Sequence, residues 1–289
     1  MIIDIHVHPF GKDMTIVPGL EEASRRMLER ATPERRERQT REFAFIFSQL
    51  TLQNLIHDMD ESKIGKACIV PMDLTTHYGV ELGTNEDMSR MASAYPDRLI
   101  PFASVDPSMG RVAVDKLVHA VKVLGCKGLK LVPPVQHFDF SDPKHNPLWE
   151  AALELNIPVW SHTSHQLSHP DSEARMGHPM LIEPVALRYP NLKIVMGHCG
   201  FPWVWDAWSL AVRHPNVYVD ISAYPSLYNH FPWDAYQKYN AEGKLLFATD
   251  YPLLGGFKTT LSALMDLHLP AEFEKKILED NPARLLGLG

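Results

Sequence analysis

The stretch IIDIHVHP, residues 2–9, alternates apolar and polar side chains with a period of two. This alternation predicts a β-strand with one apolar face, and it places His6 and His8 on the other face near the carboxyl end, where Pro9 ends the ladder. Two imidazoles spaced i, i+2 can hold one metal ion, because histidine nitrogen is a common zinc ligand. A strand with two polar tips explains these eight residues equally well. The ends of the later strands therefore decide between the two interpretations.

The composition limits the class of protein. The chain has 289 residues, 45% of them apolar, a net charge of −7 and three widely spaced cysteines. No apolar run is long enough to span a membrane, no secretory signal is visible at the N-terminus, and no basic patch favours nucleic acid. We therefore expect a cytoplasmic protein with reduced thiols, acting on a small molecule, with no membrane or nucleic-acid partner.

Strands and helices alternate regularly along the chain. Short apolar runs predict seven further strands, at 66–71, 99–104, 127–132, 157–162, 192–198, 217–221 and 245–250. Helical periodicity between them predicts helices at 51–62, 111–124, 147–155, 179–189, 203–213, 260–267 and 271–278, and one that Thr84 caps and that runs to Ala94. Eight strands in one domain of this length predict a (β/α)8 TIM barrel. A doubly wound open sheet is the alternative, but it calls for a glycine-rich phosphate turn that the sequence lacks.

Residues 10–65 form an unusually long connection after the first strand. Two charged segments, 21–31 and 33–43, are predicted to be helical and carry seven arginines mixed with glutamates. A solvated helical surface explains this pattern. The alternative is a lid, or a contact between subunits of a homo-oligomer, that lends an arginine to an acidic substrate.

Polar residues that can bind a metal follow several of the predicted strands. His6 and His8 end the first strand, His162 the fifth, His198 the sixth and Asp250 the eighth. In a (β/α)8 barrel the carboxyl ends of the strands meet at one mouth, which is where active sites form. Each residue alone is explained as a loop residue, but five together at one end indicate a shared site.

The chain resembles the amidohydrolase superfamily at this set of residues. Within that superfamily it resembles the amidohydrolase-2 branch, which includes aminocarboxymuconate-semialdehyde decarboxylase and related enzymes. Further matches lie at GLKL (128–131), PVWSH (158–162), GHCG (197–200) and NPARLLG (281–287), and the resemblance covers the chain apart from residues 10–65. The resemblance implies one divalent metal held by His6, His8, His162 and Asp250, with His198 beside it as a catalytic residue.

The chemistry of these residues agrees with that implication. Imidazoles and a carboxylate leave a position for a water whose pKa the metal lowers. Asp250 can also accept the water's proton, and His198 can hydrogen-bond the water or polarise a carbonyl. Zinc suits these ligands best, and manganese is the alternative.

Four further residues are candidate substrate contacts: Lys130, His165, Arg175 and Tyr224. In relatives with two metals, a lysine on the fourth strand is carboxylated and bridges them. Leu131, Val132 and Pro133 follow Lys130, so we expect this lysine to lie too deep for that role. Contact with a substrate carboxylate, or pairing with an acidic neighbour, is the favoured interpretation.

Two reactions fit this site. A metal-activated water could hydrolyse a small, anionic lactone, ester or amide, or the metal could bind a small unsaturated or aromatic acid that loses carbon dioxide. A decarboxylase calls for an anion clamp, and outside the insertion only Arg175 lies near a strand end, which favours hydrolysis. A barrel that binds metal without catalysis is the third interpretation.

Overall fold

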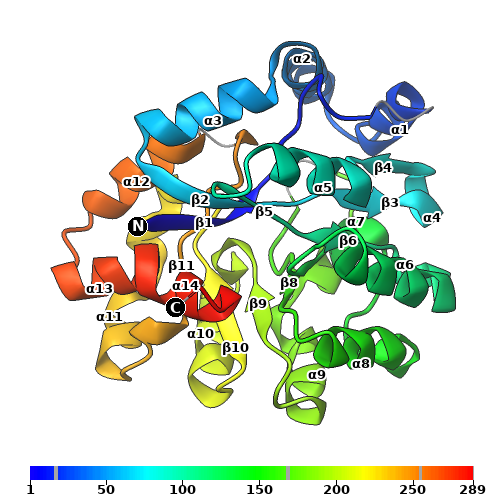
Figure 1. Cartoon of the computed structure of the whole chain (residues 1–289). Coiled ribbons are helices and arrows are strands. Elements are labelled where there is room, and N and C mark those ends of the chain that lie inside the picture. Colours follow the sequence, from blue (N-terminus) through cyan, green and yellow to red (C-terminus); the bar gives the residue numbers. More distant parts are fainter. Residues whose placement is uncertain (16–18, 167–169, 254–255, 289) are drawn as a thin grey trace.

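The chain folds into a (β/α)8 barrel, which we describe from a computed structural model for all residues except 16–18, 167–169, 254–255 and 289 (Figure 1). Its eight strand positions are the predicted ones. They are β1 (Ile2–Val7), β2 (Ile64–Ile69), β5 (Leu99–Pro101) continued by β6 (Ala103–Ser104), β7 (Leu129–Leu131), β8 (Val159–Ser161), β9 (Ile194–Met196), β10 (Val217–Asp220) and β11 (Leu245–Leu246).

These strands pair in parallel as two arcs, β1-β2-β5 and β6-β7-β8-β9-β10-β11. The third strand spans both arcs, because Phe102 N donates to Ile69 O at 2.9 Å while the next residue, Ala103, donates to Gly128 O at 2.8 Å. At the other junction Ile5 N donates to Phe247 O at 3.1 Å. The segment after β11 thus lies against β1, which joins the first and last strands of the chain.

Two apolar clusters form the core. The smaller one takes Ile3 and Ile5 from β1, Val195 from β9 and Leu246 from β11, so it fills the space that the strands enclose. The larger one packs the outer faces of the strands against the helices and includes Val7. The strict alternation predicted for β1 is therefore wrong at Val7, because the register with β2 shifts between Asp4 and Val7, and such an irregularity re-aims side chains.

The helices follow the predicted order with adjusted ends. They are α3 (Leu52–Glu61), α5 (Asn85–Ala94), α6 (Arg111–Lys122), α8 (Asn146–Glu154), α9 (Glu183–Arg188), α10 (Val204–Arg213), α12 (Gly256–Met265) and α13 (Ala271–Lys275); α14 (Asn281–Leu286) follows them and was not predicted. Thr84 caps α5 as predicted, accepting from Asp87 N in a complete capping box. The single helix predicted at 179–189 is instead a 3₁₀ turn, Pro179–Leu181, followed by α9.

Several short elements were not predicted. A hairpin of β3 (Met72–Leu74) and β4 (Val80–Leu82), closed by α4 (Thr75–Tyr78), follows β2. Two further helices are α7 (Pro133–Gln136) and α11 (Trp233–Lys238). Elements of three to six residues are too short to display a clear periodicity. No helix in the described part of the chain has both the length and the apolar character that crossing a membrane requires.

The insertion forms α1 (Leu20–Met27) and α2 (Pro33–Gln49), which stand beside the barrel in Figure 1. Both lie where helices were predicted, although residues 16–18 of the insertion are outside the described part. Thr32 caps α2 by accepting from Arg35 N, and Pro33 occupies the first turn. Helix α2 of the insertion therefore begins with the residues that usually begin a helix.

Candidate active site

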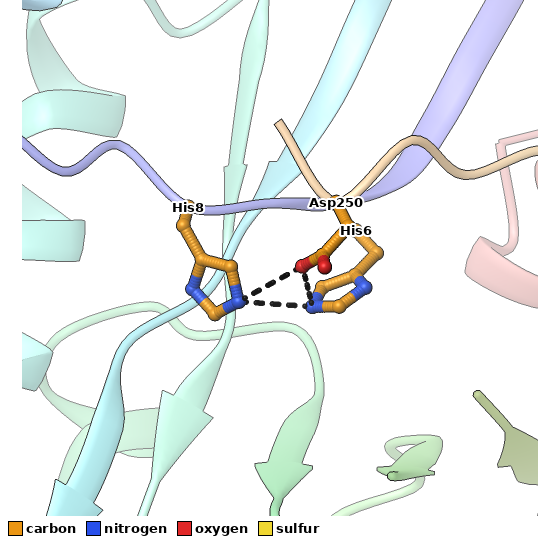
Figure 2. Close-up of side chains that lie close together, drawn as sticks. All are labelled: His6, His8 and Asp250. Carbon is orange, nitrogen blue, oxygen red and sulfur yellow. Dashed lines mark hydrogen bonds and ion pairs between the residues drawn. The ribbon is translucent and has the colours of Figure 1, made fainter. Parts of the chain in front are cut away.

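Three predicted metal ligands converge at the junction of the first and last strands. His6 Nε2 lies 3.1 Å from His8 Nε2, and Asp250 Oδ1 lies 3.6 Å from the first and 3.4 Å from the second (Figure 2). All three residues are buried. We call His6, His8 and Asp250 the central triad.

The backbone aims the carboxylate of the central triad. Asp250 has a left-handed φ of 64°, a conformation that aspartate tolerates better than most residues, and its N donates to His6 O at 3.0 Å. Asp4 links β1 to the segment that carries Asp250. Its carboxylate accepts from His6 N at 2.9 Å and from Thr249 Oγ1 at 2.6 Å. Burial raises the pKa of Asp4 to about 8. Asp4 was not predicted, since a polar residue inside a strand gives no signal of its own.

The histidines present acceptor nitrogens to one another. His8 Nδ1 donates to Val70 O at 3.1 Å, which leaves the lone pair on Nε2. His6 Nδ1 faces Ser222 Oγ at 3.4 Å and Asp220 Oδ2 at 4.0 Å, so its Nε2 is also an acceptor. Burial lowers the pKa of both rings, which keeps them neutral. Two acceptor nitrogens 3.1 Å apart repel each other unless a cation lies between them.

The donor set fits a divalent metal. Zinc bonds of about 2.0–2.2 Å place neighbouring ligand atoms roughly 3.0–3.5 Å apart, which is close to the three separations in the central triad. Two neutral imidazoles and one carboxylate are also the ligand types that zinc and manganese accept. The residues therefore suit the metal that the sequence predicts.

His198 is held in place by Asp220 and Ser222, which lie outside the central triad. It has a left-handed φ of 60°, its N donates to Asp220 Oδ1 at 2.8 Å, and its Nδ1 lies 2.8 Å from Ser222 Oγ. Ser222 Oγ donates to Asp220 Oδ1 at 2.7 Å, so the ring's Nδ1–H is directed to Ser222 and its Nε2 is an acceptor. Burial, then His162 and Lys130, lower the pKa of His198 well below its usual value. A neutral His198 is thus suited to accept a proton or a hydrogen bond from water.

His162 lies beside His198 rather than within the central triad. The two ring centroids are 4.3 Å apart, and His162 Nε2 is 2.9 Å from Ser164 Oγ. Both histidines line the same cavity as His8 and Asp250. The structure thus brings three of the four predicted ligands into contact and places the fourth at the same mouth.

Lys130 reaches the site, in keeping with its place among the candidate substrate contacts. Its Nζ is 2.8 Å from His6 Nε2 and 3.2 Å from the centre of the Trp160 ring, and the residue is 1% exposed. Burial lowers its pKa well below the usual value, against the attraction of Asp250 and Asp220. The long side chain carries the amine well beyond its Cα and into the site.

A cavity of about 820 Å³ opens above these residues, and the insertion covers it. The barrel contributes Lys130, His162, His198, Tyr224 and Asp250 to its lining, and α1 contributes Ser24 and Met27. The lining residues of α2 are Arg35, Arg38, Gln39, Glu42, Phe43, Ile46 and Phe47. Apolar atoms make up most of the wall. Residues of the insertion therefore form part of the cavity wall, while most of the α2 side chains are exposed to solvent.

The predicted substrate contacts divide into two pairs. Lys130 and Tyr224 line the cavity, and Tyr224 donates from its hydroxyl to His165 O at 2.9 Å. Among the described residues, His165 and Arg175 do not line it: the His165 ring packs on Trp203, and Arg175 is 64% exposed and pairs with Glu173.

Two supporting residues, Asp220 and Ser222, were missed. Asp220 accepts from His198 N, Ser222 N, Ser222 Oγ and Trp160 Nε1, so it orients several parts of the site. The available signal was an aspartate at the end of the seventh strand, in the same position that drew attention to Asp250.

Comparison with known proteins places this geometry in a family. The family described as "Amidohydrolase" matches residues 3–288. An uncharacterised TIM-barrel protein from Bordetella bronchiseptica is similar in structure, with 24% identity, a TM-score of 0.72, and coverage of 99% of this chain and 98% of the other. A probable 2-pyrone-4,6-dicarboxylic acid hydrolase from Acinetobacter baumannii, with citric acid bound, has 18% identity, a TM-score of 0.65 and 99% coverage of both chains.

A 5-carboxyvanillate decarboxylase from Novosphingobium aromaticivorans, complexed with manganese and 4-hydroxy-3-methoxy-5-nitrobenzoic acid, has 18% identity and a TM-score of 0.70, covering 99% of this chain and 96% of the other. At these identities the structural likenesses establish the fold, while the family match spans almost the whole chain. The chain belongs to the amidohydrolase family.

Proposed function

We propose that this protein is a metal-dependent enzyme that hydrolyses a small, anionic carbonyl compound. The observation that supports it is one cavity that is lined by His8 and Asp250 of the central triad, by His198 and Lys130, and by two arginines of α2. His6, His8 and Asp250, with His162 as the predicted fourth ligand, would hold one divalent cation. That cation supplies Lewis acidity, which polarises a carbonyl or lowers the pKa of a water.

The chain's own residues supply the proton transfers. The Asp250 carboxylate can accept a proton from the attacking water and return it to the leaving group. His198 Nε2, an acceptor held in place through Ser222, can orient the same water. Burial of the site strengthens each of these polar contacts.

The lid favours an anionic substrate with an apolar body. Arg35 and Arg38 offer guanidinium groups, which suit carboxylates, although Arg38 Nε also lies 3.7 Å from Glu42 Oε1. Phe43 and Ile46 of the same helix offer an apolar surface. One helix therefore provides both the charge and the flat contact that a small ring acid needs.

The two arginines also favour a second candidate, non-oxidative decarboxylation of an unsaturated or aromatic acid. A decarboxylase needs an anion clamp, and the arginines supply one that the barrel's own strand ends lack. A 2,6-dihydroxybenzoate decarboxylase and the 5-carboxyvanillate decarboxylase share the fold, as does the probable pyrone hydrolase, so the fold suits both reactions.

Isotope labelling of the products separates the two reactions. A panel of lactones, esters, amides and aromatic acids is screened with the metal-loaded protein in ¹⁸O water and, separately, in deuterium oxide. Hydrolysis places ¹⁸O in the product acid, whereas decarboxylation places deuterium on carbon and releases carbon dioxide. Decarboxylation alone would replace the first proposal by the second. No turnover of any compound, with the metal bound, would favour the non-catalytic interpretation.

A further inference from the structure

A second group of metal-ligand side chains lies outside the cavity. His77 belongs to α4, His137 directly follows α7, and Asp171 lies in the loop after β8. One ligand atom from each of the three lies within 4.8 Å of the others. These segments follow the carboxyl ends of β3, β7 and β8, so we call His77, His137 and Asp171 the rim cluster.

The rim cluster is held in place by its surroundings. The His77 and His137 rings stack with centroids 3.7 Å apart and planes inclined by 23°, and His77 Nε2 lies 4.0 Å from Asp171 Oδ2. His137 has a left-handed φ of 54° at the end of α7, which directs it away from the helix path. The Tyr78 hydroxyl donates to Asp171 Oδ2 at 2.5 Å and fixes the carboxylate.

Two polar atoms of the rim cluster lack a hydrogen-bond partner among the described residues. They are His137 Nε2 and Asp171 Oδ1, and both atoms are buried. A buried polar atom without a partner destabilises the folded state. In a cluster with two imidazoles and a carboxylate, a cation would satisfy both atoms at once.

We propose that the rim cluster is a second divalent-cation site, of the ligand chemistry that zinc prefers. Two imidazoles, a carboxylate and water complete such a site. The ligand atoms stand up to about 1.3 Å farther apart than the roughly 3.5 Å expected around bound zinc, so the side chains close on the ion. The site is therefore weaker than the central triad, and it fills when zinc is added.

An ion at this position would tie together the wall and the lid of the cavity. Arg26 of α1 donates to His77 O at 3.0 Å and lies 5.6 Å from the centre of the Tyr78 ring. Its neighbours Ser24 and Met27 line the cavity. Zinc at the rim cluster thus fixes α4, α7 and the loop after β8, and through α4 it steadies α1.

The test begins with a His6→Ala/His8→Ala variant, which removes the central triad. Calorimetric titration of this variant with zinc chloride is expected to give one zinc per chain and a raised thermal midpoint. Adding His137→Ala or Asp171→Asn should weaken that binding at least tenfold and abolish the thermal shift. His119→Ala, at an exposed position of α6, is the matched histidine control and should change neither.

A second measurement protects the test if the double variant fails to fold. The wild-type protein, loaded with one metal, is titrated with further zinc, and Asp171→Asn is compared with it. A second equivalent that Asp171→Asn removes would support the rim site. No zinc bound beyond the first equivalent, or binding that is insensitive to both His137→Ala and Asp171→Asn, would overturn it.

Discussion

At the scale of single residues, Asp250 combines two functions. Its Oδ1 lies within 3.6 Å of both histidines of the central triad, and it also lines the substrate cavity. We predict that Asp250→Asn keeps most of the metal, because the histidines remain, but loses at least about a hundredfold in kcat, the low end for a general acid or base. His198→Asn should behave similarly. Metal analysis and turnover are measured on both variants, and near wild-type turnover of metal-loaded Asp250→Asn would remove the proton-transfer function.

Ser222 is predicted to position His198. It lies 2.8 Å from His198 Nδ1 and donates to Asp220, so removing its hydroxyl frees the imidazole to turn. Ser222→Ala should lower kcat by about tenfold to a hundredfold, as is usual for residues that orient a site, with the fold intact.

Ser161→Ala is the matched control for Ser222→Ala, because Ser161 Oγ is buried nearby on β8 without a hydrogen-bond partner in the described residues. Equal losses in the two variants would show that Ser222 contributes packing rather than orientation.

At the scale of elements, α2 is predicted to select the charge of the substrate. Arg35 and Arg38 face the cavity, whereas Arg41 on the same helix does not line it and pairs with exposed Glu37. Arg35→Gln/Arg38→Gln should raise KM for an anionic substrate by about tenfold, and added salt should weaken wild-type binding by screening. Arg41→Gln should leave KM unchanged. Equal KM values in the wild type and the double variant would show that α2 does not select the charge of the substrate.

The capping box of α5 is predicted to contribute stability without affecting the site. Thr84 and Asp87 satisfy each other's backbone N–H groups. Thr84→Ala should lower the free energy of unfolding by about 0.5–2 kcal/mol, measured by denaturant titration. Thr259→Ala, at an exposed interior position of α12, should change it by less than about 0.5 kcal/mol. A loss as large in Thr259→Ala would mean that the cap is not the cause.

At the scale of the whole molecule, periodicity was enough to predict the barrel. The strands are apolar runs that a buried sheet requires, and the residues that end them identify the mouth. His6, His8 and Asp250 could be predicted for that reason, since position at a strand end is visible in a sequence.

The sequence did not predict how far a side chain extends or which distant residues hold a site residue in place. Lys130 Nζ arrives at His6 through a flexible stem, and Asp220 acts through Ser222 on a residue 22 positions earlier. The arginines of α2 cover the mouth only because the insertion folds over it. The position of Asp220 at a strand end is visible in the sequence, but the contacts themselves leave no local pattern in it.

The most direct test of the account is the tightly bound metal content of the wild type and of His6→Ala/His8→Ala, after passage through a mild chelator that strips weaker sites. We predict close to one divalent metal per chain in the wild type, and neither metal nor turnover in a double variant that keeps its circular dichroism spectrum. The aliphatic core does not depend on these two side chains. Wild-type metal content in the double variant, or two tight metals with a carboxylated Lys130, would contradict the mononuclear site.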